Sequence, residues 1–238
     1  MTQKTLIVLL ALLIICGAAG SYIYFLTKET GQEPKLEETS INPMDHLVFE
    51  VKKENYSEFQ TDKAFGKFNS SKNTIEQATA DGVELSSSNL YYDWLNITGA
   101  MHMIGDYERE IEILKWFAEA YQGNSISPSN LGVIYKSFVV NNDLSEKYFL
   151  MALEREKNHY DIYYNLHELY RYNFEDSKKA VDILEQGREN NPDERKFVTT
   201  LIDYHLLLEG KDKASQVLDE WLVEHPEDFS LEAKIEGN

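Results

Sequence analysis

Histidines, the single cysteine and the carboxylates are the residues of this chain that could perform catalysis or hold a metal ion. The 238-residue sequence has six histidines, one cysteine and 41 acidic residues. No two histidines share a metal-ligand spacing on one helix face, and His167-Glu168 lacks the second histidine of a zinc-protease helix. A GxSxG nucleophile motif and a glycine-rich phosphate loop are also absent from the sequence. We therefore predict that the protein is not an enzyme and expect neither a metal nor a cofactor.

Composition narrows the classes of partner. The 41 acidic residues outnumber the 23 basic ones, which gives a formal net charge of −18. A nucleic acid needs a basic stripe on its partner, so we expect no nucleic-acid binding, and binding flat on anionic lipid is disfavoured for the same reason. Hydrophobic residues at 42% are ample for a folded core. One cysteine excludes an intrachain disulfide.

From about residue 90 the sequence repeats every 34 or 35 residues. A short or small residue opens the second helix of each unit: Glu110, Ser145, Ala180 and Ala214. An apolar residue recurs in each first helix: Ile97, Leu131, Leu166 and Leu201. Further apolar residues follow at helical spacing, so every stretch has one stripe that can face a neighbouring helix. The fold class predicted is all-α, with four antiparallel helix pairs over residues 91–228 stacked as a solenoid.

Turn and cap residues support these boundaries. Gly105 and Gly210 are expected to end first helices in a left-handed conformation, and Asp106 and Asp212 to cap the second helices. Ser127-Pro128 predicts a helix start in the second repeat. Helix ends are predicted at two prolines, Pro192 and Pro226.

The repeat resembles the tetratricopeptide repeat (TPR) family. The resemblance covers well over half the chain and is carried by these residues: Trp94, Ile97, Gly105, Tyr107, Leu114, Phe117, then Leu131, Gly132, Tyr135, Phe149, Ala152, then Tyr163, Leu166, Tyr170, Ala180, Leu184, Pro192, then Leu201, Gly210, Ala214, Leu218, Pro226. Departures from the family pattern are Glu110 and Ser145 in place of Ala, and Gly187 and Trp221 in place of Ala. The resemblance implies a concave face lined by the first helices, which binds a protein or peptide.

A row of polar side chains precedes the aligned apolar residues of the first helices. The row consists of Asn96, Asn130, Asn165 and Thr200. The resemblance implies that such a row points into the groove and can hydrogen-bond the backbone of an extended peptide, because each amide carries both donors and an acceptor. The alternative is structural, since asparagine at this position can also bond neighbouring helices.

Cations and tyrosines are the other candidate partner-binding residues. Six positions after the row come His102, Lys136 and Arg171, and Lys196 adds a fourth cationic or titratable group. The candidate tyrosines are Tyr92, Tyr164 and Tyr172. A peptide with an acidic group and an apolar anchor would suit this lining. The alternative is that the cations pair with Glu168, Asp161 or Asp203 inside the protein.

The N-terminus is predicted to be a membrane anchor, residues 1–28. Residues 5–26 carry no charge, lie between Lys4 and Lys28, and would span roughly 33 Å as a helix, enough to cross a bilayer. A cleaved signal peptide is the alternative, with small residues at 17–20 as its cleavage site. Tyr22, Tyr24 and Phe25 favour the retained anchor, because aromatic residues are enriched at membrane interfaces. We expect a single-pass protein whose soluble part lies outside the cytoplasm.

The segments between anchor and repeats are less regular. Residues 29–45 are polar and acidic and are interpreted as a linker. Residues 46–90 are poorly defined and are interpreted as a degenerate helical hairpin, with a loop at Gly66–Asn73 and a helix start at Thr74. Residues 229–238 are expected to be a tail.

The function predicted is a membrane-tethered protein-interaction module that binds a peptide or protein in the concave face of the solenoid. The alternative is a structural subunit of a larger membrane-associated assembly without a dedicated peptide groove.

Overall fold

The computed structural model describes residues 41–52 and 56–236, and this part of the chain is helical with no β-strand. The predicted anchor and most of the predicted linker lie outside the described residues. None of the described helices is both long and apolar enough to cross a lipid bilayer.

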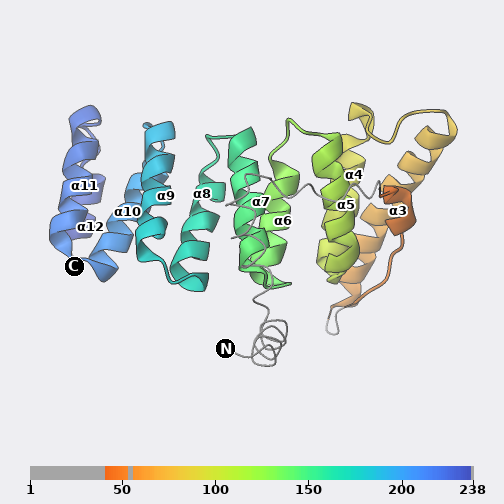
Figure 1. Ribbon diagram of the computed structural model, residues 1–238, viewed down its shortest axis with the longest axis horizontal. Helices are drawn as coiled ribbons and strands as arrows, with labels where there is room; N and C mark the ends of the chain where they lie inside the picture. The colour runs from red at the N-terminus through yellow and green to blue at the C-terminus, as the bar shows by residue number, and fades with distance from the viewer. Residues whose placement is uncertain (1–40, 53–55, 237–238) are drawn as a thin grey trace, which may run out of the picture. The chain divides into compact units, whose positions relative to one another are not determined.

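Four helix pairs follow one another along the described chain. Their bounds are α4 (Tyr91–Ile104) with α5 (Tyr107–Ala120), α6 (Ile126–Ser137) with α7 (Asn142–Arg155), α8 (Tyr160–Glu168) with α9 (Ser177–Asn190), and α10 (Arg195–Leu208) with α11 (Lys211–Glu224). A π-helical turn, η3 (Leu169–Asn173), extends α8. Each helix packs mainly against the next one in the chain (Figure 1). The prediction of an all-α fold of stacked helix pairs is therefore confirmed for the described residues.

Most predicted helix ends are correct, and two starts are wrong. Helices α9 and α11 end just before Pro192 and Pro226. Helix α6 begins at Ile126, because the Ser127 hydroxyl donates to the Leu114 carbonyl oxygen of α5 (2.5 Å) instead of capping its own helix. Helix α11 begins at Lys211, so Asp212 lies inside the first turn, where its charge still favours the positive end of the helix dipole.

The turn inside each pair contains one residue with positive φ, and these residues are spaced 35 apart. Gly105 (φ 74°) and Gly210 (φ 100°) were expected there, whereas Val140 (φ 54°) and Glu175 (φ 55°) hold the same place in the middle repeats. A side chain on Cβ disfavours this backbone region, most of all in a β-branched residue. Val140 is therefore a strained turn residue.

The interpretation of residues 46–90 as a hairpin is wrong. A single helix, α3 (Glu58–Ala80), packs on α4, and it is preceded by a short 3-10 helix, η1 (Pro43–His46). The start of α3 is a capping box, in which the Gln60 N–H donates to Ser57 Oγ and the Ser57 N–H donates to Gln60 Oε1 (3.2 Å each). Gly66 and its polar neighbours, expected as a loop, belong to this helix.

Two glycines let aromatic rings fill the space between packed helices. A Cβ on Gly132 would lie 2.6 Å from the Phe149 ring, and a Cβ on Gly187 would lie 2.2 Å from the Phe197 ring. Gly187 departs from the alanine of the family pattern, and the Phe197 ring accounts for the departure. Close packing of this kind leaves no room for even one methyl group.

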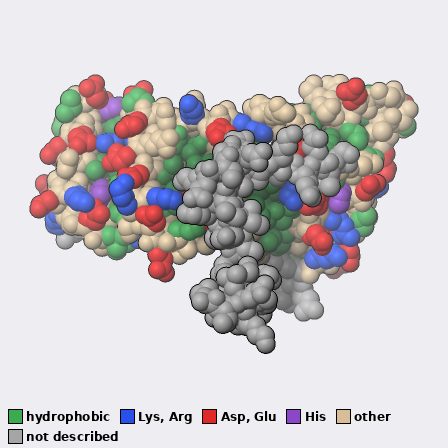
Figure 2. All heavy atoms as spheres, viewed as in Figure 1, with side chains coloured by type: hydrophobic (Ala, Val, Ile, Leu, Met, Phe, Trp, Pro, Cys, Tyr) green, Lys and Arg blue, Asp and Glu red, His purple; other side chains and the backbone are tan. Residues whose placement is uncertain are grey.

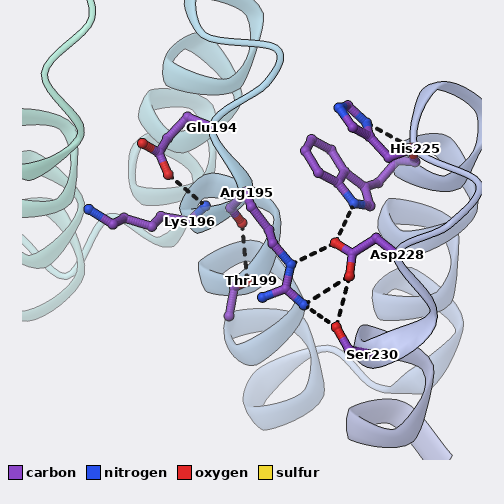
Figure 3. Close-up of polar contacts among 8 residues, drawn as sticks. Glu194, Arg195, Lys196, Thr199, His225, Asp228 and Ser230 are labelled. Carbon is purple, nitrogen blue, oxygen red and sulfur yellow. Dashed lines mark hydrogen bonds and ion pairs between the residues drawn. The ribbon is translucent and has the colours of Figure 1, made fainter.

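The C-terminal residues described, expected as a tail, cover the last pair. A 3-10 helix, η4 (Phe229–Leu231), leads into α12 (Glu232–Glu236), which packs on α11. Arg195 of α10 donates to Asp228 Oδ2 (2.6 Å, from Nε) and to Ser230 Oγ (2.6 Å, from Nη2), and the Trp221 indole N–H also donates to Asp228 (3.0 Å) (Figure 3). These bonds join α10, α11 and the C-terminal turn.

Candidate functional site

The predicted polar row uses most of its hydrogen-bonding groups inside the protein. Asn96 donates to the buried Ser71 hydroxyl of α3 (3.2 Å). Asn165 Oδ1 accepts from Lys136 Nζ (2.7 Å) while Asn165 Nδ2 donates to the Asp161 carbonyl oxygen (2.8 Å). These contacts are those expected if the asparagines bond neighbouring helices.

The other two members of the row differ from each other. Thr200 Oγ1 donates to the Lys196 carbonyl oxygen (2.8 Å) and lies 2.7 Å from the Tyr160 hydroxyl. Among the described residues, Asn130 has no side-chain hydrogen bond. Only Asn130 therefore keeps its whole amide for a ligand.

Two of the four predicted cationic groups are paired. Lys136 Nζ lies 2.9 Å from Glu168 Oε2, which links α6 to α8 and matches the pairing alternative. His102 Nδ1 lies 3.2 Å from both carboxylate oxygens of Glu110. Glu110 is only 3% exposed, and burial raises the pKa of its carboxyl while the His102 contact opposes that rise. Both contacts join helices of the protein to each other, so these two groups are already partnered inside the fold.

Arg171 and Lys196 have aromatic neighbours instead of carboxylates. The Arg171 guanidinium lies over the rings of Tyr172 (4.7 Å) and Tyr204 (5.2 Å), and the Lys196 ammonium lies over the Tyr160 ring (5.2 Å). Within residues 41–52 and 56–236, neither cation has a carboxylate at ion-pair distance. A cation held over a ring still has donors for an anionic ligand.

These side chains lie on α8, η3 and α10, and we call the set the aromatic stripe; Tyr204 is its one buried member. Its members are Tyr160, Tyr164, Arg171, Tyr172, Lys196, Thr200 and Tyr204. Tyr164 stacks on Tyr160 (5.8 Å between centroids), and Tyr172 is 62% exposed. Burial raises the pKa of both the Tyr160 and the Tyr164 phenol, so both hydroxyls stay protonated at neutral pH.

One end of the aromatic stripe is hollowed. An open hollow of about 300 Å³ is lined by Tyr160, Arg195, Lys196, Thr199 and Thr200. Arg195 points towards Asp228 and Ser230, whereas Lys196 extends the opposite way, towards α8 (Figure 3). The Arg195 guanidinium lowers the pKa of Asp228 to about 2, so this pair stays ionised and leaves Lys196 as the cation that an incoming group would meet.

The structure does not bring all predicted site residues together. Tyr92 is 75% exposed on α4 and contacts Tyr91 (5.2 Å), and it lies on a different helix pair from the aromatic stripe. The sequence analysis missed Tyr160 and Tyr204. Tyr160 and Tyr164 are spaced i, i+4, which places them on one helix face, and that spacing could have identified Tyr160.

Charge on the visible face of the last helices is mixed. Figure 2 shows Lys and Arg side chains interspersed with Asp and Glu over α8 to α12. The aromatic stripe is therefore marked by two cations that lie over tyrosine rings close together on neighbouring helix pairs, and not by a large basic field.

Comparison with known proteins adds little. No protein-family model and no curated protein matches the chain. Among solved structures, "Crystal structure of MamA" matches with 18% identity over 74% of this chain and 99% of that one, with a TM-score of 0.47. "MamA RS-1 ArsTM double mutant" matches with 14% identity over 68% of this chain and 97% of that one, with a TM-score of 0.44. Likeness at this level supports no inference about function.

Proposed function

We propose that the protein is a TPR-like protein-interaction module and that its aromatic stripe binds an acidic segment of a protein or peptide. The observation that carries the proposal is the pair Arg171 and Lys196. In a chain of net charge −18, both lie over tyrosine rings with no carboxylate of the described residues at ion-pair distance. An acidic side chain of a partner can take that place, and the exposed tyrosines supply amphipathic contact area.

The hollow beside Lys196 defines how such a ligand would lie. Its lining combines the Lys196 ammonium, the Arg195 side chain that is paired with Asp228, two threonines and a tyrosine ring. A carboxylate in the hollow would meet the Lys196 ammonium, because the hydroxyls of Thr199 and Thr200 already donate to backbone carbonyl oxygens of α10, while an apolar neighbour in the peptide would lie on Tyr160 and Tyr164. This is recognition by side chains, and it does not require the ladder of asparagines.

The proposal includes a membrane tether. Its support is the charge-free run at residues 5–26, which is long enough to cross a bilayer. The helical body would then be held close to one membrane, on the extracytoplasmic side, as a single-pass protein.

The test is site-specific photocrosslinking in native membranes. A photoreactive amino acid replaces Tyr164 in the aromatic stripe, and the matched control replaces Phe229, which is 62% exposed on η4. We expect a crosslinked partner from position 164 that is absent from position 229 and lost when Lys196→Glu is added. Equal crosslinks from both positions, or crosslinks that are unchanged by Lys196→Glu, would reject the aromatic stripe as the binding site.

The alternative of a structural subunit is favoured by the internal bonds of Asn96, Asn165 and Thr200. The dependence of partner capture on ionic strength distinguishes the two functions. Capture through Lys196 and Arg171 should weaken as ionic strength rises, because exposed charge contacts are screened within about 10 Å at 0.1 M salt. An obligate apolar interface would persist under the same conditions.

A further inference from the structure

The turns inside the last three helix pairs carry exposed apolar side chains along one edge of the described body, and Val51 lies beside the first turn. We call this set the apolar edge: Val51, Val139, Val140, Tyr172, Leu207 and Leu208. Val140 is 68% exposed and Leu207 is 67% exposed. Every member lies at or beside the C-terminal end of a pair's first helix. Exposed apolar residues in consecutive repeats form a pattern, unlike single scattered ones.

Contacts join the first three of these turns to one another. The Phe138 ring stacks on Tyr107 (4.4 Å), which joins the second turn to the first. Asn173 donates to Asn142 Oδ1 (3.2 Å), which joins the third turn to the second. Figure 1 shows these turns along one side of the row of helices, with the turn between α10 and α11 following in the same line.

The strained residue of the fold belongs to this edge. Val140 has a φ of 54°, although glycine fills the equivalent place at Gly105 and Gly210 without strain. The turn is held by the Asn141 N–H, which donates to the Tyr135 carbonyl oxygen (2.8 Å). A β-branched apolar residue that is both strained and 68% exposed brings no benefit to the packed core. Its side chain is available for contact with something outside the described body.

The loops at the opposite edge differ in chemistry. They join successive pairs and are mainly polar or acidic, with Glu156, Asp193, Glu194, Glu227 and Asp228 among their residues. In the last two turns of the apolar edge, basic and acidic residues balance instead: Glu175, Asp176, Lys178 and Lys179, then Glu209, Lys211, Asp212 and Lys213. Exposed apolar residues also occur beside the opposite loops, at Val223 and Phe229, but the loops there carry the acidic residues named above.

The described chain reaches this edge eleven residues after Ile41. The Lys52 N–H donates to the Ile104 carbonyl oxygen (3.1 Å) at the end of α4, which places Val51 beside the first turn. Fourteen residues separate Leu26, the end of the apolar run, from Ile41, the first described residue. Fourteen residues reach at most about 50 Å when fully extended, so a tethered body cannot leave the vicinity of the bilayer.

We propose that the apolar edge docks on the surface of the bilayer to which the chain is tethered, with Val139, Val140, Leu207 and Leu208 entering the boundary between headgroups and acyl chains. The proposal rests on the tether in the proposed function. The surface it fits is zwitterionic lipid, because the net charge of −18 opposes approach to anionic lipid. Docking would engage Tyr172, which belongs to both sets, and would leave the rest of the aromatic stripe, on the faces of α8 and α10, open to a partner.

The test uses the full chain reconstituted in phosphatidylcholine vesicles that contain doxyl-labelled lipid. Cys16, the single native cysteine, is changed to Ser, and an environment-sensitive fluorophore is attached at V140C, at L207C or, as the matched control, at N158C in the opposite loop between α7 and α8. Flotation of the vesicles measures the tether separately. We expect the protein to float, and the doxyl lipid to quench the labels at 140 and 207 roughly twofold more than the label at 158.

The possible outcomes separate the two claims. If the protein floats but the labels at 140 and 207 are quenched no more than the label at 158, docking is overturned and the tether stands. If those labels shift to the blue without doxyl quenching, a protein surface covers the edge, and docking on lipid is overturned. If the protein does not float, the tether and the docking that depends on it both fail. Circular dichroism of each labelled variant confirms that it is folded.

Discussion

The first and last helix pairs share one framework but differ at the crossing of their helices and on the exposed face. At the crossing, the first pair buries Glu110 and the last buries Ala214. The residue aligned with His102, the partner of Glu110, is Leu206 in the last pair. A buried carboxylate is tolerated where the same pair supplies a polar partner, so the repeat framework does not by itself dictate a small residue at the crossing.

The exposed faces of these pairs differ for a related reason. In the first pair, α3 packs on α4 and the Ser71 hydroxyl takes the Asn96 amide. In the last pair, Lys196 contacts only a tyrosine ring through its ammonium group among the described residues. A polar side chain of a first helix becomes available to a ligand where no neighbouring helix supplies its partner, and this condition holds for Asn130 on α6 and for the ammonium group of Lys196 on α10.

The largest loss of stability is expected when a carboxylate is placed at the helix crossing of the last pair. Ala214→Glu should lower the free energy of unfolding by about 3–5 kcal/mol, because the new charge would be buried next to Leu206 without a partner. Chemical denaturation measures the loss. The reciprocal change Glu110→Ala should cost no more than about 1 kcal/mol, because the family pattern has alanine there and His102 remains partly solvated. Equal costs for the two variants would mean that His102 does not compensate Glu110.

A smaller loss is expected at the C-terminal end. Asp228→Asn should lower the free energy of unfolding by about 1–2 kcal/mol, because it weakens the charge-assisted bonds from Arg195. Asp182→Asn provides a matched control, since Asp182 pairs only with the highly exposed Lys178 in the described structure, and it should change stability by less than about 0.5 kcal/mol.

The same pair predicts a pH dependence. The folded pKa of Asp228, about 2, lies below its ordinary value of 3.8, so the unfolded chain binds more protons between these two values. The stabilisation is complete above about pH 4 and is lost as pH falls towards 2. Thermal unfolding of the native chain and of Asp228→Asn should therefore converge on acidification. A difference that stays constant down to pH 2 would show that the carboxylate charge is not what stabilises this end.

The smallest change in stability is expected at the turn residues with positive φ, which are glycines in the outer pairs but Val140 and Glu175 in the middle pairs. Val140→Gly should raise the free energy of unfolding by about 0.5–1 kcal/mol, because relief of the left-handed strain exceeds the extra entropy of glycine in the unfolded chain. Val139→Gly, at a neighbouring residue without positive φ, should instead be neutral or destabilising. If both variants lose stability equally, Val140 is not strained.

Much of the repeat architecture could be predicted from sequence, because it depends on local signals. The recurrence of aligned residues such as Leu166 and Leu201, and the stops at Pro192 and Pro226, are properties of single helices and turns. Helix α3 could not be predicted, since its buried face includes Ala64 and the polar Ser71, which weaken the apolar period.

The candidate site was predicted less completely, because it depends on contacts between distant helices. Lys136 and Asn165 were both identified, but sequence could not show that they bond each other across 29 positions. Whether Lys196 and Arg171 find a carboxylate also depends on which side chains the neighbouring helix presents. The tyrosines that they contact, Tyr160 and Tyr204, were missed for the same reason.

The central claim is that the aromatic stripe binds an acidic segment through Arg171 and Lys196. The most direct measurement is selection from a random peptide library on the full chain in detergent, repeated on the double variant Arg171→Glu/Lys196→Glu and on the surface control Lys178→Glu. The account predicts that the native chain and the control enrich peptides rich in Asp, Glu and aromatic residues, and that the double variant does not. Enrichment of the same acidic peptides by the double variant, or of no acidic peptides by the native chain, would contradict it.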